Sequence, residues 1–188
     1  MDTVRIICCE PPLEWVTWWP GLDDAGLAGF VSASSDPRRA ETEIRSLDAV
    51  AQADETAVLC GLWFPEHTGG GSAATMIVHS YRRDQALDLA YQEAVRSCRI
   101  TPPLPGCLIS SYEFFENQVD IGKLVGQEIL FSDDDDQMIY QMRYTVFSTV
   151  KDEVVVFDFS TTDLGWANVM AEDSVDIISG AFYLEESA

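Results

Sequence analysis

The C-terminal segment, residues 137–188, restricts the possible folds of this sequence more than any other part. Side chains alternate from Gln137 to Phe147 with the two-residue period of a β-strand. The β-branched and aromatic run from Val154 to Phe159 predicts a second strand, and the Ser-Thr-Thr-Asp sequence after it supplies side chains that cap helices. The segment therefore predicts two strands, a helix and a short closing strand. One face of the first strand would carry Met138, Tyr140, Met142, Tyr144 and Val146. The helix would bury Leu164, Ala167, Ala171, Val175 and Ile178, which recur at helical spacing.

Length and composition predict one domain. The chain has 188 residues and 47% hydrophobic content, enough to bury a substantial core. We expect a single domain over residues 1–188, with residues 1–55 as an N-terminal elaboration and residues 56–188 as the core. No run of 18 apolar residues predicts a membrane helix, and the start Met1 to Arg5 lacks the pattern of a secretory signal. The expected compartment is the cytoplasm.

The net charge narrows the choice of partners. Thirty-two acidic residues against 11 basic ones give a net charge of -21. Nucleic acid binding needs basic patches that release counterions, so we expect no nucleic acid partner and no insertion into a membrane. An acidic surface attracts basic proteins and speeds their association. The alternative, that the acidity reflects only a solvated surface or a high-salt host, stays open at this point.

The remaining elements predict an antiparallel sheet with helices packed on it. Segment 13–35 shows only weak periodicity, whereas Asp36 and Pro37 are typical of a helix start, with Ala40, Ile44, Leu47 and Ala51 as its apolar stripe. Runs of adjacent strands favour antiparallel pairing over alternating parallel units. The other predicted elements are a strand at 4–9, a hairpin from 56–64 and 73–81, a helix capped by Asp84, three strands at 107–115, 118–123 and 127–131, and an acidic turn at 133–136.

Residues 57–184 resemble the PsbP-like superfamily, in particular its bacterial members of unassigned function. The segments that carry most of the likeness are Val155 to Thr161 and the helix end from Asp176 to Phe182, with the Gly126 to Ile129 turn before a strand. The resemblance implies an α/β/α sandwich on a central antiparallel sheet, used for binding rather than catalysis. Relatives act as an extrinsic photosystem subunit, a GTPase-binding factor, lipoproteins and chaperones of secreted toxins. Residues 1–55 fall outside the resemblance.

The residues that could support catalysis or metal binding are few. His67 and His79 are the two histidines, and neither sits in a recognisable catalytic motif. The five cysteines lack the paired spacing of zinc or redox sites, and the Asp133 to Asp136 run lacks the spacing of a calcium loop. We therefore predict no enzyme activity, no cofactor and no metal. Hydrolysis by His67 with Glu66 or Cys60 is the least favoured class.

Aromatic residues are the candidate binding residues. Trp15, Trp18 and Trp19 fall within five residues of one another, and tryptophan is enriched at interface hot spots. The alternative is that they plug the edge of the core. The same two alternatives, binding surface or core, apply to Tyr140, Tyr144 and Trp166.

The leading hypothesis is a non-enzymatic protein-binding module, an accessory, chaperone or immunity protein of a bacterial secretion or toxin system, with a basic protein partner. The alternative is a small-molecule or hydrophobic-peptide binding protein, with a groove between sheet and helix. Homodimerisation through a sheet edge or an aromatic face stays open.

Overall fold

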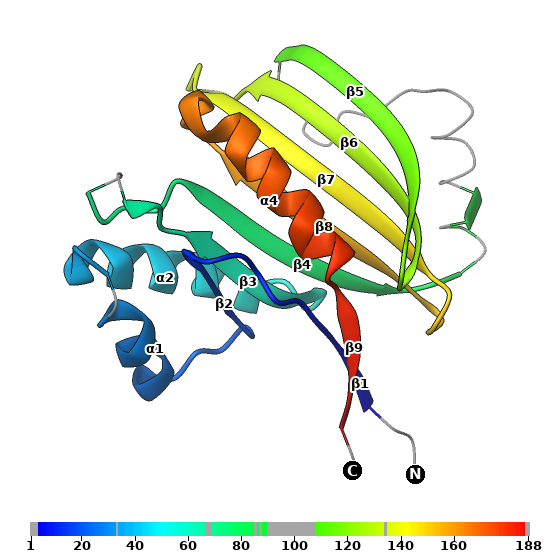
Figure 1. Ribbon diagram of the computed structural model, residues 1–188, viewed down its shortest axis with the longest axis horizontal. Coiled ribbons are helices and arrows are strands. Elements are labelled where there is room, and N and C mark those ends of the chain that lie inside the picture. Colours follow the sequence, from blue (N-terminus) through cyan, green and yellow to red (C-terminus); the bar gives the residue numbers. More distant parts are fainter. Residues whose placement is uncertain are drawn as a thin grey trace.

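A seven-stranded antiparallel sheet forms the centre of the molecule (Figure 1). The computed structural model describes residues 4–32, 34–66, 69–84, 86, 88–89, 108–133 and 135–186. The strand order is β2-β3-β4-β8-β7-β6-β5, so β2 and β5 form the two edges. The strands are β2 (Trp15–Trp18), β3 (Ala57–Trp63), β4 (Ala74–Arg82), β5 (Leu108–Val119), β6 (Gly122–Ser132), β7 (Met138–Ser148) and β8 (Glu153–Thr161). A separate ribbon pairs β1 (Val4–Cys8) with β9 (Phe182–Glu186).

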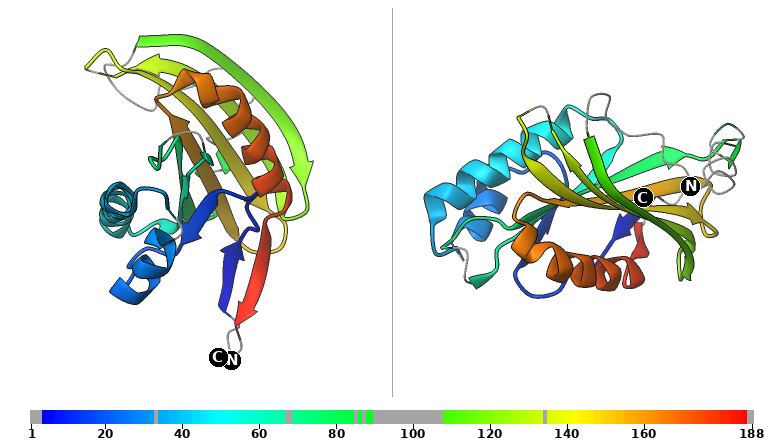
Figure 2. Two further views of the ribbon diagram at one scale, coloured as in Figure 1. Left: turned by 60° about the vertical axis from the view of Figure 1, so that its left-hand side comes forward. Right: turned by 90° about the horizontal axis from the view of Figure 1, so that it is seen from above.

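Helices cover both faces of this sheet, as the two views in Figure 2 show. Helix α4 (Ala167–Ser179) packs on β7 and β8, while α2 (Pro37–Gln52) packs on β3 with α1 (Asp24–Val31) beside it. Each face has its own apolar cluster, one including Phe157, Phe159 and Met170 and the other Ile44 and Leu62. The predicted α+β class with an antiparallel sheet is confirmed. None of the helices in the described ranges is long and apolar enough to cross a membrane.

The C-terminal unit forms as the sequence predicts, with one correction. Alternate residues of β7, including Met142 and Tyr144, are buried, and Asp163 accepts a hydrogen bond from the Gly165 amide at 3.0 Å. The predicted buried stripe is only partly right, because Leu164 and Val175 are exposed. The first turn is a 3-10 helix, η2 (Leu164–Trp166), whose tighter winding shifts the phase of the following α-helix. The residues that α4 buries are Met170, Ser174, Ile177 and Ile178.

The N-terminal elements are partly predicted. Helix α2 begins as expected, with Asp36 accepting a hydrogen bond from the Arg39 amide at 3.2 Å and Pro37 in its first turn. The β3-β4 hairpin is also confirmed. Strand β2 and helix α1 were not predicted, because the residues that form them show only weak periodicity. Strand β2 extends the sheet by pairing Trp15 with Trp63 and Trp18 with Cys60.

The three strands predicted between 107 and 131 are wrong, because the chain forms two long strands there. Strand β5 continues through Glu116 and Asn117, which were expected to separate two strands, and turns at Asp120 into β6. Polar residues fit this edge strand because their side chains stay exposed. The acidic turn is confirmed, with Asp133 accepting hydrogen bonds from the Asp135 and Gln137 amides. The helix predicted after Asp84 lies mostly outside the described residues.

Candidate functional site

Trp15 belongs to an aromatic cluster between the sheet and α4. Its ring stacks on Trp63 at 6.1 Å between centroids and meets Phe159 edge-on at 5.8 Å. Trp166 meets Trp63 edge-on at 5.2 Å, and Tyr144 meets Phe159 at 6.1 Å. The Trp15 indole also donates to Asp173 on α4 at 2.8 Å. Trp15 is only 7% exposed, so it fixes edge strand β2 to α4.

Trp18 lies on the opposite face of the sheet. It is 4% exposed, packs on Phe30 of α1 and donates its indole N–H to Asp48 Oδ1 at 3.0 Å. The same oxygen accepts from the Gly21 amide at 2.9 Å. Asp48 on α2 therefore holds the chain segment that follows β2.

The six predicted binding residues do not share one exposed face. Tyr140 and Tyr144 are buried with Trp15 in the α4 cluster, and Trp166 is half-buried against it. Trp18 is buried in the other cluster. Trp19 alone of the three clustered tryptophans is exposed, at 55%. The question of core or surface is thus decided for each tryptophan: Trp15 and Trp18 pack the core, and Trp19 faces solvent.

His79 lies on the α2 face of the sheet between two carboxylates. Its Nδ1 is 3.3 Å from Asp54 and 3.1 Å from Thr56 Oγ1, and its Nε2 is 3.9 Å from Asp158. Asp158 also forms a bidentate ion pair with Arg143, at 2.6 Å and 3.0 Å. The Arg143–Asp158 pair therefore links β7 to β8, and His79 of β4 lies beside it.

Of the residues named for hydrolysis, the structure describes Cys60 and Glu66. Cys60 is fully buried, and burial, with the negative charge of Asp48, raises the pKa of its thiol to about 12. A thiol with that pKa is protonated near neutral pH and is a poor nucleophile. His67 lies outside the described residues. In the described part of the chain, no group of three or more His, Cys, Asp or Glu side chains is arranged to hold a metal ion.

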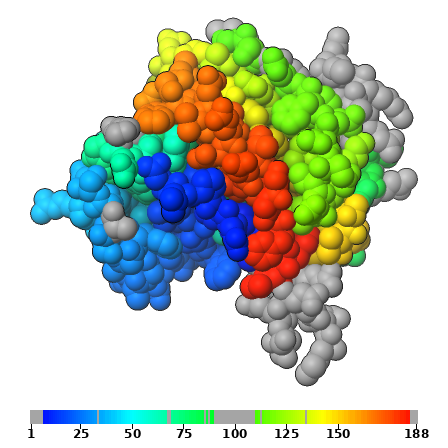
Figure 3. Space-filling view, viewed as in Figure 1, coloured from blue at the N-terminus to red at the C-terminus, as the bar shows by residue number. Residues whose placement is uncertain are grey.

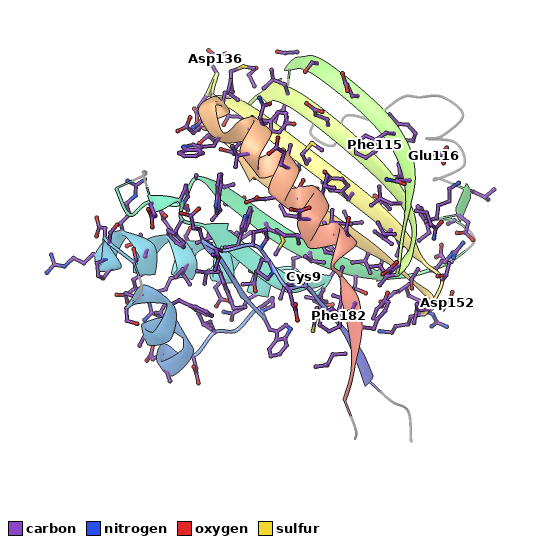
Figure 4. The ribbon with its side chains drawn as sticks, in the orientation of Figure 1. Cys9, Phe115, Glu116, Asp136, Asp152 and Phe182 are labelled. Carbon is purple, nitrogen blue, oxygen red and sulfur yellow. The ribbon has the colours of Figure 1, made fainter. Side chains whose placement is uncertain are left out.

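One side of the sheet ends in a long edge strand, β5. Strand β5 is twelve residues long, and within the described ranges no strand pairs with its outer edge. Phe115 on β5 lies across Gly126 of β6 and meets Tyr144 edge-on at 6.0 Å, yet it stays 36% exposed. The ring occupies the space that a side chain at position 126 would need. Figure 4 labels Phe115 and Glu116 on this strand, to the side of α4.

Two glutamates lie beside Phe115 on the same face. Glu113 on β5 is directly opposite Glu128 on β6, so two like charges face each other across the strands. Tyr140 lies next to them. Burial raises the pKa of the Tyr140 hydroxyl, and a hydrogen bond to Glu128 and the charges of Glu128 and Glu113 raise it further. We call Glu113, Phe115 and Glu128 the β5 shelf. Sequence analysis missed it because the strand was divided at Glu116.

Comparisons with known proteins place the fold but not the function. No protein-family model and no curated protein matches the chain. The crystal structure of LpqN, a protein involved in cell envelope biogenesis in Mycobacterium tuberculosis, is similar with a TM-score of 0.54 and 10% identity, over 97% of this chain and 86% of LpqN. PA94 of Pseudomonas aeruginosa, a protein of unknown function, has a TM-score of 0.40 and 10% identity, over 55% and 69% of the two chains. The likeness to LpqN shows a shared fold alone.

Proposed function

We propose that this chain is a non-enzymatic protein-binding module with a PsbP-like α/β/α sandwich, and that its partner is a basic protein. One observation carries the proposal: a twelve-residue edge strand lies at the side of the sheet in a chain of net charge -21. Strand edges present main-chain groups that can pair with another chain. Acidic surfaces favour basic partners and repel acidic ones.

The proposal includes a role as an accessory, chaperone or immunity protein of a bacterial secretion or toxin system, in the cytoplasm. Support for this part comes from the resemblance of residues 57–184 to PsbP-like proteins. The envelope role of LpqN is a property of that protein, and the likeness supports only the fold.

A groove lined by the tryptophans is the weaker candidate. Trp15, Trp63 and Trp166 pack on one another and on Phe159, so their rings fill the space between β2, β3 and α4. A hydrophobic ligand at that place would have to displace side chains of the core. Binding that quenches the fluorescence of the buried tryptophans without unfolding would favour this second function.

Capture of a partner from the native host tests the leading proposal. The chain is immobilised, extract is applied at low salt, and bound protein is eluted with rising salt. We expect a basic protein that elutes as the screening length falls from about 10 Å at 0.1 M to about 3 Å at 1 M salt. An unrelated acidic protein of similar size and charge serves as the control bait. The proposal is wrong if nothing is retained beyond what the control bait retains.

A further inference from the structure

We infer that the partner docks as an extended basic segment that adds a strand to β5, with its cationic side chains over Glu113 and Glu128 and an apolar side chain on Phe115. This inference rests on the proposed function and names its mode of binding. The proposed occupant of this surface is a peptide segment, not the folded face of another protein and not a second copy of this chain.

The two edges of the sheet differ in how they are protected. Edge strands are usually blunted by short length, proline, lysine or a bulge. Strand β2 has four residues and lies between Pro11-Pro12 and Pro20. Strand β5 has twelve residues and contains neither proline nor lysine, with one irregularity in register between Ile109 and Ser111. From Ser111 to Val119 its pairing with β6 is regular, so within the described part of the chain its other edge is a continuous template for another strand.

The chemistry of the β5 shelf selects a basic segment. Like charges directly opposite each other on a sheet destabilise it. Neither Glu113 nor Glu128 has an ion pair with any of the described basic side chains; the neighbouring Lys123 pairs with Glu116. A lysine or arginine on a strand added to β5 would lie beside Glu113, on the side away from Glu128, and its charge would offset part of this repulsion. Figure 3 shows atoms of β5 and β6 (green) next to α4 (orange).

The spacing along β5 also predicts a pattern in the partner. Side chains alternate along a strand, so Glu113 and Phe115 point to the same face, two residues apart. An added strand would place a basic residue beside Glu113 and an apolar residue beside Phe115, also two residues apart. In strand addition the main-chain bonds supply affinity and the alternate side chains supply specificity. The partner segment should therefore contain a basic and an apolar residue at positions i and i+2.

The charge on β5 argues against a second copy as the occupant. Two β5 strands paired edge to edge would bring Glu113 and Glu116 of each copy close to those of the other. That arrangement adds like-charge contacts instead of removing them. A basic segment removes them, so charge complementarity favours it.

A peptide titration followed by amide NMR tests this mode of binding. The probe is a synthetic peptide of repeating Lys-Ser-Val-Ser sequence, about ten residues long, so that lysine and valine stand two residues apart on one face of the strand. We expect chemical-shift changes concentrated on the amides of β5. A second peptide of the same sequence, N-methylated at alternate residues, keeps the charge but cannot form the strand ladder, and it should bind at least tenfold more weakly. A third, with glutamate in place of lysine, should not bind.

Two double variants with the same loss of charge show which carboxylates contribute to peptide binding. The double variant E113Q/E128Q should weaken binding of the lysine-valine peptide about fivefold, the scale of two exposed ion pairs. The control E172Q/D176Q removes the same charge from the exposed side of α4 and should change binding less than twofold.

The inference is overturned if the peptide does not bind, if shifts spread over the whole acidic surface, if the N-methylated peptide binds equally, or if both double variants behave alike. A host partner that is retained equally by E113Q/E128Q would overturn the docking mode alone, whereas capture of no partner overturns the proposed function.

Discussion

Replacing Asp48 with alanine should destabilise the protein strongly, because this carboxylate holds the chain after β2. Its Oδ1 accepts hydrogen bonds from the Trp18 indole at 3.0 Å and the Gly21 amide at 2.9 Å, and its Oδ2 accepts one from Gln52 at 2.6 Å. Trp18 and Asp48 are both buried, so alanine would leave the indole donor without an acceptor, at a cost of about 1–3 kcal/mol. Gly21 is exposed, so water can replace the acceptor of its amide, and the loss there is only that of a net hydrogen bond, about 0.5–1.5 kcal/mol. The expected loss is therefore about 1.5–4.5 kcal/mol, a large part of the 5–15 kcal/mol typical of a domain.

The matched control is Glu41→Ala on the same helix. Glu41 forms an exposed i,i+4 ion pair with Arg45, worth about 0.3–0.5 kcal/mol. Both substitutions remove one negative charge from a chain of net charge -21, so the difference between them isolates the buried hydrogen bonds. Asp48→Asn, which keeps an acceptor oxygen without the charge, should fall between the two. Urea unfolding, monitored by tryptophan fluorescence and circular dichroism, gives the free energies. A difference below about 0.5 kcal/mol between Asp48→Ala and Glu41→Ala would refute this account of the N-terminal segment.

Three further experiments test other parts of the structure. Gly126→Ala should force the Phe115 ring off β6, with a loss of about 1–2 kcal/mol in unfolding free energy and altered ring-current shifts in NMR spectra; an unchanged Phe115 environment would contradict the packing. Because burial raises the pKa of Cys60 to about 12, the unfolded chain loses this proton first above the ordinary value of 9.0. Stability should then fall by up to about 1.4 kcal/mol per pH unit there, and wild type should lose more than Cys60→Ala between about pH 8 and pH 10. A double-mutant cycle of Arg143→Met and Asp158→Ala should give a coupling of about 1–3 kcal/mol, and a value near zero would show that the bidentate pair does not stabilise the sheet.

The elements that the sequence predicted are those whose burial pattern or helix cap is determined by residues close by in the chain. Strand β7 alternates buried and half-buried residues from Tyr140 to Val146, and Asp36 and Asp163 cap helices through neighbours two or three residues away. Strand β2 gave no such signal. The burial of its Trp15 depends on Asp173 of α4, and that of Trp18 depends on Asp48, contacts that cross 158 and 30 residues of chain. No local pattern contains that information.

Glycine and polar residues misled the prediction at β5 and β6 for a related reason. Gly126 indicated a turn, but it lies inside β6 because the Phe115 ring needs the space above it. Glu116 indicated a strand end, but on an edge strand its side chain remains in solvent. Whether a strand lies at the edge depends on the order of all seven strands. The β5 shelf could be recognised only after that order was known.

The acidity of the chain also explains how a long, open edge strand can avoid self-pairing. Glu113 and Glu116 on β5 repel their counterparts in another copy at low salt, where charges interact over about 10 Å. At about 1 M salt the screening length falls to about 3 Å and this protection weakens, while the pairing of main-chain groups and the exposed Phe115 ring are unaffected. We therefore expect the protein to be monomeric at low salt and to self-associate increasingly towards 1 M salt in sedimentation velocity experiments. The variant Glu113→Gln removes one of these charges and should associate at lower salt than wild type. If the sedimentation coefficient stays constant over this range, or if Glu113→Gln and wild type associate at the same salt concentration, negative charge on β5 does not prevent self-association.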